Sequence, residues 1–239
     1  MLVEEIRFTC LKFGKKIISI GGGGFTHETD ESLDQFVLGQ LSIKNFKIGF
    51  LPTASQDNQK KIDLFYKRFE NIGSKLSHFN LCSKIEGFRD WLLSKDIIYV
   101  GGGNTFYMLE IWEKNNLIEI FKEAHDKGII LSGVSAGAVC WFDWILSDSK
   151  GSGLKPLRGI NLISGSCTPH SSDEERINQF QKDIKNNKLP EGIAIDDGVA
   201  VLFIDGKAAE VYSSRKNHDA YFINKSKKIS LKEHIKKNL

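Results

Sequence analysis

Three short apolar segments of this 239-residue chain each run into a cluster of small residues, and this repeated pattern limits the folds that the chain can adopt. The segments and clusters are Lys15–Ile20 with Gly21–Gly24, Asp96–Val100 with Gly101–Gly103, and Ile129–Leu131 with Gly133–Gly137. A short apolar run that stops at glycines is typical of a buried strand that ends in a tight loop. Each cluster is therefore expected at the carboxyl end of a buried strand.

Segments with apolar residues at helical spacing alternate with these strands and with two further strands. The expected helices are 30–41, 57–72, 87–93, 106–112 and 117–124, and the further strands are 47–54 and 76–81. Asp30 or Thr29 would cap the first helix. This alternation predicts parallel pairing through right-handed crossovers, with helices on both faces of the sheet. We expect an α/β fold, a three-layer sandwich with a mainly parallel sheet flanked by helices and with binding sites outside the carboxyl ends of the strands.

The pattern changes in the C-terminal part of the chain. Residues 143–169 are expected to be rich in loops, and residues 173–185 to form a helix. Short strands are expected at 192–195, 199–204, 208–211 and 220–223. Asp205-Gly206 between two of them is a strong signal for a hairpin. Because no linker or repeat intervenes, we expect one domain over residues 1–239, with a C-terminal antiparallel extension and a basic tail, 226–239.

Composition and charge favour a soluble protein of the cytoplasm. Apolar residues make up 41% of the chain, and the net charge is only +3. No apolar run is long enough to cross a membrane, and Met1–Glu5 carry acids where a signal peptide needs bases. The four cysteines show no spacing typical of a zinc site or a disulfide framework, which indicates reduced thiols. We interpret the basic tail as a solvated surface, not as a nucleic-acid or membrane contact.

The segment Gly133-Val134-Ser135-Ala136-Gly137 has the G-x-S-x-G pattern of a nucleophile elbow. In such an elbow, a serine sits on a strained turn between a strand and a helix, and the flanking glycines let the two backbones pass closely. The serine would lie at the sheet edge beside the positive end of the next helix. The alternative is an ordinary glycine-rich turn with a hydrogen-bonded serine.

A serine needs a base and oxyanion donors to act as a nucleophile. Among six histidines, His170 is the candidate base, because it follows a predicted strand end downstream of Ser135. The backbone N–H of Ala136 is one expected oxyanion donor, and that of Gly102 or Gly103 is the second. The Gly101–Gly103 loop could equally be an anion-binding nest or a plain turn. It lacks the lysine of a P-loop, which argues against nucleotide hydrolysis.

The carboxylate that would orient the base is less clearly marked. Several acids follow the serine or the histidine: Asp143, Asp148, Asp173, Glu174 and Glu175. The orienting carboxylate must lie buried beside the imidazole. Asp148 is preferred because its segment is the one most able to fold back toward the site. Glu174 is the alternative, although a solvated acid in the first turn of a helix would look the same.

Three groups of residues in this order resemble the peptidase E family of serine peptidases, which includes cyanophycinases. They are Gly101-Gly102-Gly103-Asn104-Thr105-Phe106, Gly133-Val134-Ser135-Ala136-Gly137-Ala138 and Pro169-His170. Further similarity lies in Ser19–Gly23, Phe50–Ser55 and Ala194–Gly198, so that the resemblance covers about residues 15–225. It implies a fold similar to class I glutamine amidotransferases. It also implies Ser135 as nucleophile, His170 as base, and an oxyanion hole formed by Gly102 or Gly103 with Ala136.

The chain departs from the family branch that cleaves after an N-terminal aspartate. That branch carries an arginine after the serine, whereas Cys140–Asp148 contains no basic residue. A substrate carboxylate would require a guanidinium partner, so strict aspartyl specificity is not expected. Trp141, Phe142 and Trp144 in this segment would either line an apolar pocket or pack in the core.

These observations together predict a cytoplasmic serine peptidase, a dipeptidase or small-peptide exopeptidase that forms an acyl-enzyme on Ser135. We expect no metal or cofactor, no nucleic-acid or membrane partner, and a monomer or homodimer. Two alternatives stay open: an amidase or esterase of the same fold, and a non-catalytic homologue that binds a ligand at the glycine loops.

Overall fold

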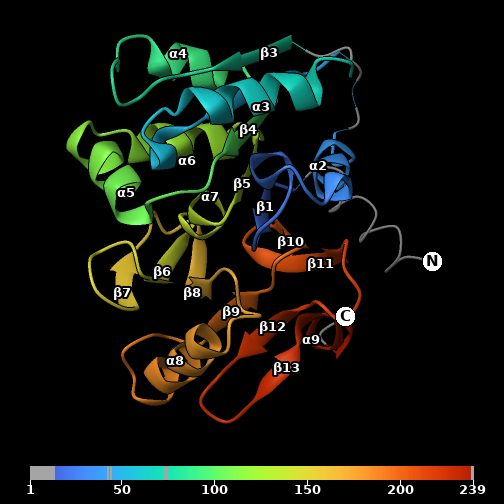
Figure 1. The fold of residues 1–239 in the computed structure, drawn as a ribbon, viewed down its shortest axis with the longest axis vertical. Helices are drawn as coiled ribbons and strands as arrows, with labels where there is room; N and C mark the ends of the chain where they lie inside the picture. The colour runs from blue at the N-terminus through green and yellow to red at the C-terminus, as the bar shows by residue number, and fades with distance from the viewer. Residues whose placement is uncertain (1–13, 42, 44, 73–74, 238–239) are drawn as a thin grey trace.

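Five adjacent parallel strands make up most of the larger of two sheets (Figure 1). They are β1 (Lys16–Ile20), β2 (Lys47–Leu51), β3 (Lys75–His78), β4 (Ile97–Val100) and β5 (Ile130–Val134). The full order of this seven-stranded sheet is β11-β10-β1-β5-β4-β2-β3. The computed structural model describes residues 14–41, 43, 45–72 and 75–237. Cys10 and the acidic segment Met1–Glu5 lie outside the described residues.

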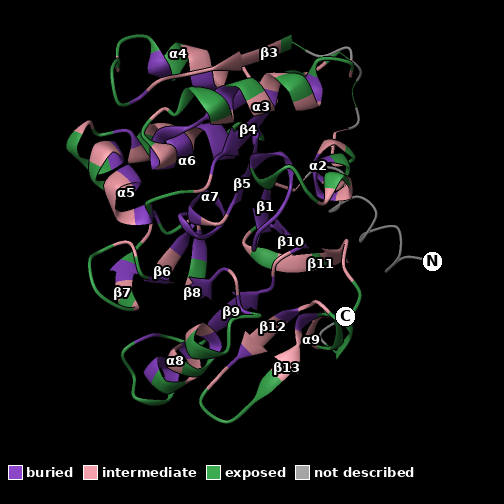
Figure 2. Cartoon of the chain, in the orientation of Figure 1, coloured by how far each residue is buried: buried purple, intermediate pink, exposed green. Residues whose placement is uncertain are grey.

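Helices cover both faces of this sheet, which confirms the predicted sandwich. α2 (Glu31–Leu38) and α3 (Gln59–Phe69) pack on one face, and α4 (Phe88–Leu93), α5 (Thr105–Lys114) and α6 (Ile118–Asp126) pack on the other. Within β1, Ile18 and Ile20 join the first of these cores, whereas Ile17 joins the second. Both faces of β1, β2, β4 and β5 are buried, and Figure 2 shows this in β1, β4 and β5. For this reason the strands read as continuous apolar runs.

The first of these helices does not begin as expected. Asp30 stands at the N-cap position of α2, but its side chain makes no capping hydrogen bond and its backbone is left-handed (φ 51°). Its carboxylate instead binds Arg215, far along the chain. By contrast, the side chain of Asn58 caps α3 in the ordinary way, accepting a hydrogen bond from the backbone N–H of Lys61.

The second sheet corrects the expectation that residues 143–169 are mostly loop. Its six strands have the order β13-β12-β9-β8-β6-β7. Three of them fall in or next to that region: β6 (Phe142–Ser147), β7 (Lys155–Arg158) and β8 (Ile163–Thr168). β8 contains mostly small polar residues, which have no strand signature of their own. It forms a strand because it pairs in parallel with β6 and with β9 (Gly192–Ile195) on its two sides.

The predicted C-terminal strands are present, but they are divided between the two sheets. β10 (Val199–Ile204) and β11 (Lys207–Ser213) form an antiparallel hairpin that extends the larger sheet beside β1. Asp205 and Gly206 form its turn with φ of 49° and 76°, as a two-residue hairpin requires. β9 and β12 (Ala220–Ile223) instead belong to the smaller sheet, where β9 is parallel to β8 and antiparallel to β12.

The smaller sheet is covered on one face by α8 (Glu174–Lys185), whose Ile177, Phe180 and Ile184 meet residues of β6, β9 and β12. On its other side, Ile145, Cys167 and Ile195 belong to the same apolar core as the α4–α6 layer. The basic tail forms β13 (Lys228–Ser230) and α9 (Leu231–Lys237). In the part of the chain that is described, no helix is both long and apolar enough to cross a membrane.

Candidate active site

Ser135 lies at a sharp turn between β5 and the short helix α7 (Ala136–Val139). Its backbone is left-handed (φ 55°), and its N–H donates to the carbonyl oxygen of Ile20 on neighbouring β1. A Cβ on Gly133 would overlap the carbonyl of Gly137, and a Cβ on Gly137 would overlap that of Val100. The two glycines of the motif are therefore required by close backbone packing, as the pattern predicts.

His170 reaches Ser135 from the smaller sheet. It follows β8 after Pro169, and its backbone is also left-handed (φ 52°). Its Nε2 lies 2.9 Å from Ser135 Oγ. Both side chains thus extend from strained backbone positions, which are concentrated at functional sites in proteins.

The carboxylate beside His170 belongs to Asp197, 2.6 Å from Nδ1 to Oδ1. This corrects the expectation that Asp148 would fold back against the histidine. Asp148 is 65% exposed and pairs with Arg176 of α8 at 3.0 Å. The alternative, Glu174, lies exposed in the first turn of α8. Asp148 thus lies at the surface beside α8 and not against the histidine.

The three side chains form a hydrogen-bonded chain with one consistent proton arrangement. An ionised carboxylate only accepts hydrogen bonds, so Nδ1 of His170 carries the proton that is donated to Asp197. Nε2 is then free to accept from the hydroxyl of Ser135. The pKa of the Asp197 carboxyl is lowered from its usual value, chiefly by the hydrogen bond with His170. The charges of His170, Arg215 and His27 act in the same direction, whereas partial burial opposes them.

These residues come from both sheets. Ser135 follows β5 of the larger sheet, and His170 follows β8 of the smaller sheet. Asp197 lies in the short connection Asp196–Gly198, where the chain crosses from β9 in the smaller sheet to β10 in the larger. In Figure 1 most of the smaller sheet lies in the lower half of the view, below β1 and β5. The site is therefore built where the two sheets meet.

The expected oxyanion donors lie beside Ser135. A Cβ on Gly102 would be 3.3 Å from Ser135 Cβ and 3.8 Å from its Oγ, so this backbone passes directly over the hydroxyl. Gly103 (φ 146°) is pressed against the carbonyl of Ala54. Within the described residues, the backbone N–H groups of Gly102, Gly103 and Ala136 have no hydrogen-bond acceptor. They are therefore free to donate to another acceptor.

Sequence reasoning missed Asp197, although a signal for it was present. Asp196 and Asp197 directly follow the buried strand β9 and precede Gly198 (φ 74°). This is the same strand-end position that pointed to His170. Asp196 turns away from the histidine: its Oδ1 accepts from Ser171 Oγ at 2.6 Å, and its Oδ2 accepts from the N–H of Asp219 at 3.1 Å.

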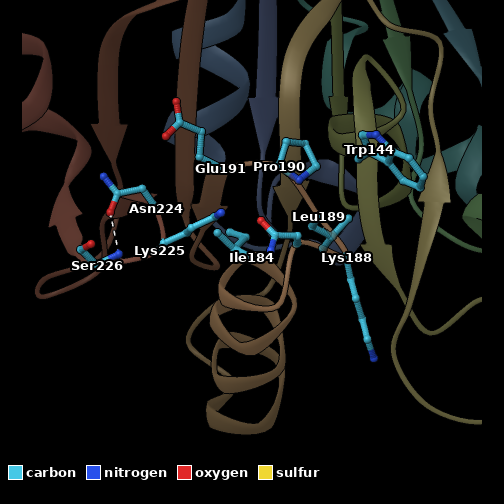
Figure 3. Close-up of a pocket in the computed structure, with 10 residues that line it drawn as sticks. Trp144, Ile184, Lys188, Leu189, Pro190, Glu191, Asn224, Lys225 and Ser226 are labelled. Carbon is cyan, nitrogen blue, oxygen red and sulfur yellow. Dashed lines mark hydrogen bonds between the residues drawn. The ribbon is translucent and has the colours of Figure 1, made fainter.

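The aromatic segment after Ser135 does not line the site. Trp141 and Phe142 are fully buried in the core. Trp144 instead borders a cavity of about 600 Å³ (Figure 3), which is formed near the end of α8 by residues that include Leu189 and Lys225. α8 begins just after His170, and its 12 residues extend about 18 Å, so the cavity lies at the far end of that helix.

Comparison of the sequence with known proteins identifies a family. A model described as peptidase family S51 matches residues 17–211. The chain is 39% identical over 210 residues to the uncharacterized peptidase YgaJ of Bacillus subtilis (strain 168), with 87% of this chain and 91% of that protein covered. It is 24% identical over 223 residues to Peptidase E of Nostoc sp., with 82% and 90% covered.

Two solved structures share the fold. The crystal structure of a peptidase from an acI-B1 actinobacterium has a TM-score of 0.65 at 16% identity, with 91% of this chain and 97% of that chain covered. The structure of a putative peptidase E protein from Listeria monocytogenes EGD-e has a TM-score of 0.62 at 19% identity, with 84% and 98% covered. The family model spans most of the chain, and the chain therefore belongs to peptidase family S51, the family of peptidase E.

Proposed function

We propose that this peptidase is a serine peptidase that hydrolyses short peptides through an acyl-enzyme on Ser135. The observation that carries the proposal is the hydrogen-bonded chain from Ser135 Oγ through His170 to Asp197, with distances of 2.9 and 2.6 Å. Asp197 takes the orienting role that the sequence had assigned to Asp148. The names of the related proteins support a peptide substrate.

In the first half of the reaction, Ser135 Oγ attacks the scissile carbonyl carbon while its proton moves to Nε2 of His170. The negative charge that develops on the carbonyl oxygen is stabilised by the free N–H groups of Ala136 and of Gly102 or Gly103. His170 then gives the proton to the leaving amine, and the C–N bond breaks. Asp197 stays ionised throughout and stabilises the imidazolium.

In the second half, a water molecule attacks the acyl-enzyme. His170 removes a proton from this water, and the tetrahedral intermediate collapses when Ser135 Oγ takes the proton back. The products are a carboxylic acid, an amine and the free enzyme. Every step uses only groups of this chain and water.

The segment after the serine bears on specificity. Cys140–Asp148 contains no lysine or arginine, and Trp141, Phe142, Ile145 and Leu146 are buried in the core. This segment therefore offers no guanidinium to a substrate carboxylate. Peptides without an acidic residue at the scissile bond are the substrates to be tried first.

The decisive experiment combines a fluorophosphonate probe with hydrolysis of a short-peptide library. We expect labelling on Ser135 and loss of both labelling and hydrolysis in Ser135→Ala. Ser132→Ala is the matched control, because Ser132 is buried on the same strand and donates to the carbonyl of Ile98.

Three other outcomes would each overturn the proposal. Labelling with turnover only of small esters or amides would indicate an esterase or amidase of the same fold. No labelling and no turnover would indicate a ligand-binding homologue. Full peptide hydrolysis by Ser135→Ala would refute the nucleophile.

A further inference from the structure

Asp30 and Arg215 form an ion pair that the proposed reaction does not itself use. Arg215 donates from Nε to Oδ1 at 3.0 Å and from Nη2 to Oδ2 at 2.6 Å. Ser214 Oγ donates to the same carboxylate at 2.7 Å. The Asp30 side chain is only 9% exposed and that of Arg215 is 37% exposed. These contacts hold the pKa of the Asp30 carboxyl well below its usual range.

The Asp30–Arg215 pair lies against the segment Asp196–Gly198, which carries Asp197. The Arg215 side chain lies flat over Gly198, because a Cβ there would be 2.6 Å from Cγ and Cδ of the arginine. The carbonyl of Gly198 accepts from the N–H of Ser214 at 2.9 Å, and its N–H donates to the carbonyl of Gly22 at 2.8 Å. The residue next to Asp197 is thus held on both sides.

The loop after β1 contacts Asp197 from another side. A Cβ on Gly22 would overlap Asp197 Oδ1 and approach His170 Cε1 to 3.0 Å. The backbone of Gly22 is therefore in close contact with both Asp197 and His170. A Cβ on the next residue, Gly23, would lie 2.7 Å from Asp30 Oδ2. The carboxylate of Asp30 therefore supports the same loop on which Asp197 rests.

The two partners of the ion pair come from elements that also meet elsewhere. Asp30 starts α2, and Arg215 follows β11 in the connection that returns to the smaller sheet (Figure 1). Phe36 of α2 stacks on Tyr212 of β11 with ring centroids 5.0 Å apart. The chain passes between the two sheets at Asp196–Gly198 and again after β11. The Asp30–Arg215 ion pair therefore connects the segment after β11 to the loop after β1, which contacts Asp197.

We propose that Arg215 and Asp30 act together as a charge-balanced pair of positioning residues, which supports the Asp197 carboxylate against His170 and keeps the imidazole able to act as a base. This inference rests on the proposed serine peptidase mechanism. Arg215 balances the charge of Asp30 and also acts through space on Asp197, the carboxylate that faces the histidine. Loss of Arg215 removes this positive charge and leaves the nearly buried Asp30 carboxylate without its ion-pair partner. More negative surroundings favour the protonated imidazolium, which cannot act as a base.

Within residues 14–237, apart from the gaps in that range, a small set of charged groups acts on Asp197. His170 donates to it, Arg215 and His27 act on it through space, and Asp30 reaches it through Arg215. The neighbouring Asp196 is occupied by Ser171 and the Asp219 N–H. A change in the Asp30–Arg215 pair is therefore expected to register in the titration of His170.

The test compares Arg215→Met, Arg215→Lys and Asp30→Asn/Arg215→Met with the wild type. Two quantities are measured: the acid limb of the pH profile of kcat/KM, and the NMR titration of the His170 ring in a Ser135→Ala background. We expect Arg215→Met to move the acid limb and the His170 titration to higher pH by about half a unit or more. This is the effect expected from the loss of one nearby charge at a partly exposed site. We expect the kcat of this variant to fall while KM changes little, since the proposed role acts through Asp197 and His170.

The other variants separate charge balance from packing. Arg215→Lys keeps the charge, and the double variant removes both charges, so each should leave the acid limb near its wild-type position. Arg89→Met is the matched control, because Arg89 forms a comparable two-bond pair with Glu123 between α4 and α6. It should change neither quantity.

The inference is overturned if Arg215→Met alters stability or activity while the His170 titration stays in place. It is also overturned if Arg215→Lys and the double variant shift that titration as much as Arg215→Met. The NMR titration requires no turnover, so it can be read even if Ser135→Ala retains hydrolysis and the proposed mechanism fails. An unshifted titration with Ser135→Ala inactive would overturn the positioning role alone.

Discussion

The turn that carries Ser135 and the crossing that carries Asp197 provide two parts of the same site in different ways. The serine turn is specified within five residues, because Gly133 and Gly137 are required by backbone packing around it. The crossing Asp196–Gly198 has no such local motif. Its position depends on Gly22, Ser214 and the Asp30–Arg215 pair, which are distant in the sequence. The proposed nucleophile is thus encoded locally, whereas the position of the proposed orienting acid depends on the assembled fold.

The largest effect is expected from breaking the serine turn. In Gly137→Ala, the added methyl group would overlap the Val100 carbonyl. Since the obstacle is backbone, the loss should exceed the roughly 1–3 kcal/mol of ordinary overpacking, and little folded protein should form. Urea unfolding and soluble yield measure this. Gly87→Ala is the control: its φ is 79° but no atom lies within 4 Å of the new Cβ, so it should cost only about 1 kcal/mol. Equal stabilities of the two variants would contradict the steric argument.

Asp197→Asn should affect chemistry and not folding. An amide does not hold the imidazole in the required tautomer, and we expect kcat to fall about 10³–10⁴-fold with a nearly unchanged melting temperature. His170→Ala should fall about as far, and a double variant no further, since such residues act as a unit. Steady-state kinetics with the best library peptide provide the measurement. A kcat within tenfold of wild type would remove Asp197 from the mechanism.

The buried carboxyl of Asp34, next to the loop after β1, makes the stability of the fold depend on pH. Asp34 contacts Tyr99 at 3.4 Å and lies under Gly24, and burial raises the pKa of its carboxyl to about 7. An unfolded chain ionises this group near its ordinary value of 3.8. The folded state is therefore penalised progressively as pH rises from about 4 to about 7, by at most about 4 kcal/mol.

Asp34→Asn should remove that penalty. We expect the difference in unfolding free energy between Asp34→Asn and the wild type to shift in favour of the variant as pH rises through this range, and then to level off. Chemical denaturation at several pH values measures it. Asp63→Asn, at an exposed site on α3, is the control. A difference that does not change between pH 4 and pH 8 would show that Asp34 does not titrate as described.

The smallest effect is expected at Asp148, the acid that the sequence favoured. Its pair with Arg176 is at the surface, and such pairs contribute between zero and about 1 kcal/mol. Asp148→Asn should leave kcat/KM within about twofold of wild type and the melting temperature nearly unchanged. If Asp148→Asn were inactive and Asp197→Asn active, the two assignments would be reversed.

The order of the helices and strands of the larger sheet was predictable from the sequence. Short apolar runs identified β1, β2, β4 and β5, because each of these strands is buried on both faces and therefore consists mainly of apolar residues. The hairpin at Asp205-Gly206 was equally local, since two consecutive positive φ angles favour such residues. The strands β6 and β7 were not predicted, and of β8 only its end before His170 was expected. β7 and β8 contain few apolar residues and depend on pairing with neighbouring strands, whereas the mostly apolar β6 falls in a segment that was expected to be rich in loops.

The site divides in the same way. Ser135, its glycines and its neighbouring N–H groups follow from a short motif, because steric fit within one turn leaves few alternatives. His170 could be chosen from its place after a strand. Which carboxylate meets it was decided by the fold, because Asp197 reaches His170 only where the chain crosses between the two sheets. Contacts within a turn are encoded by adjacent residues, whereas a contact across a sheet junction exists only after both sheets have formed.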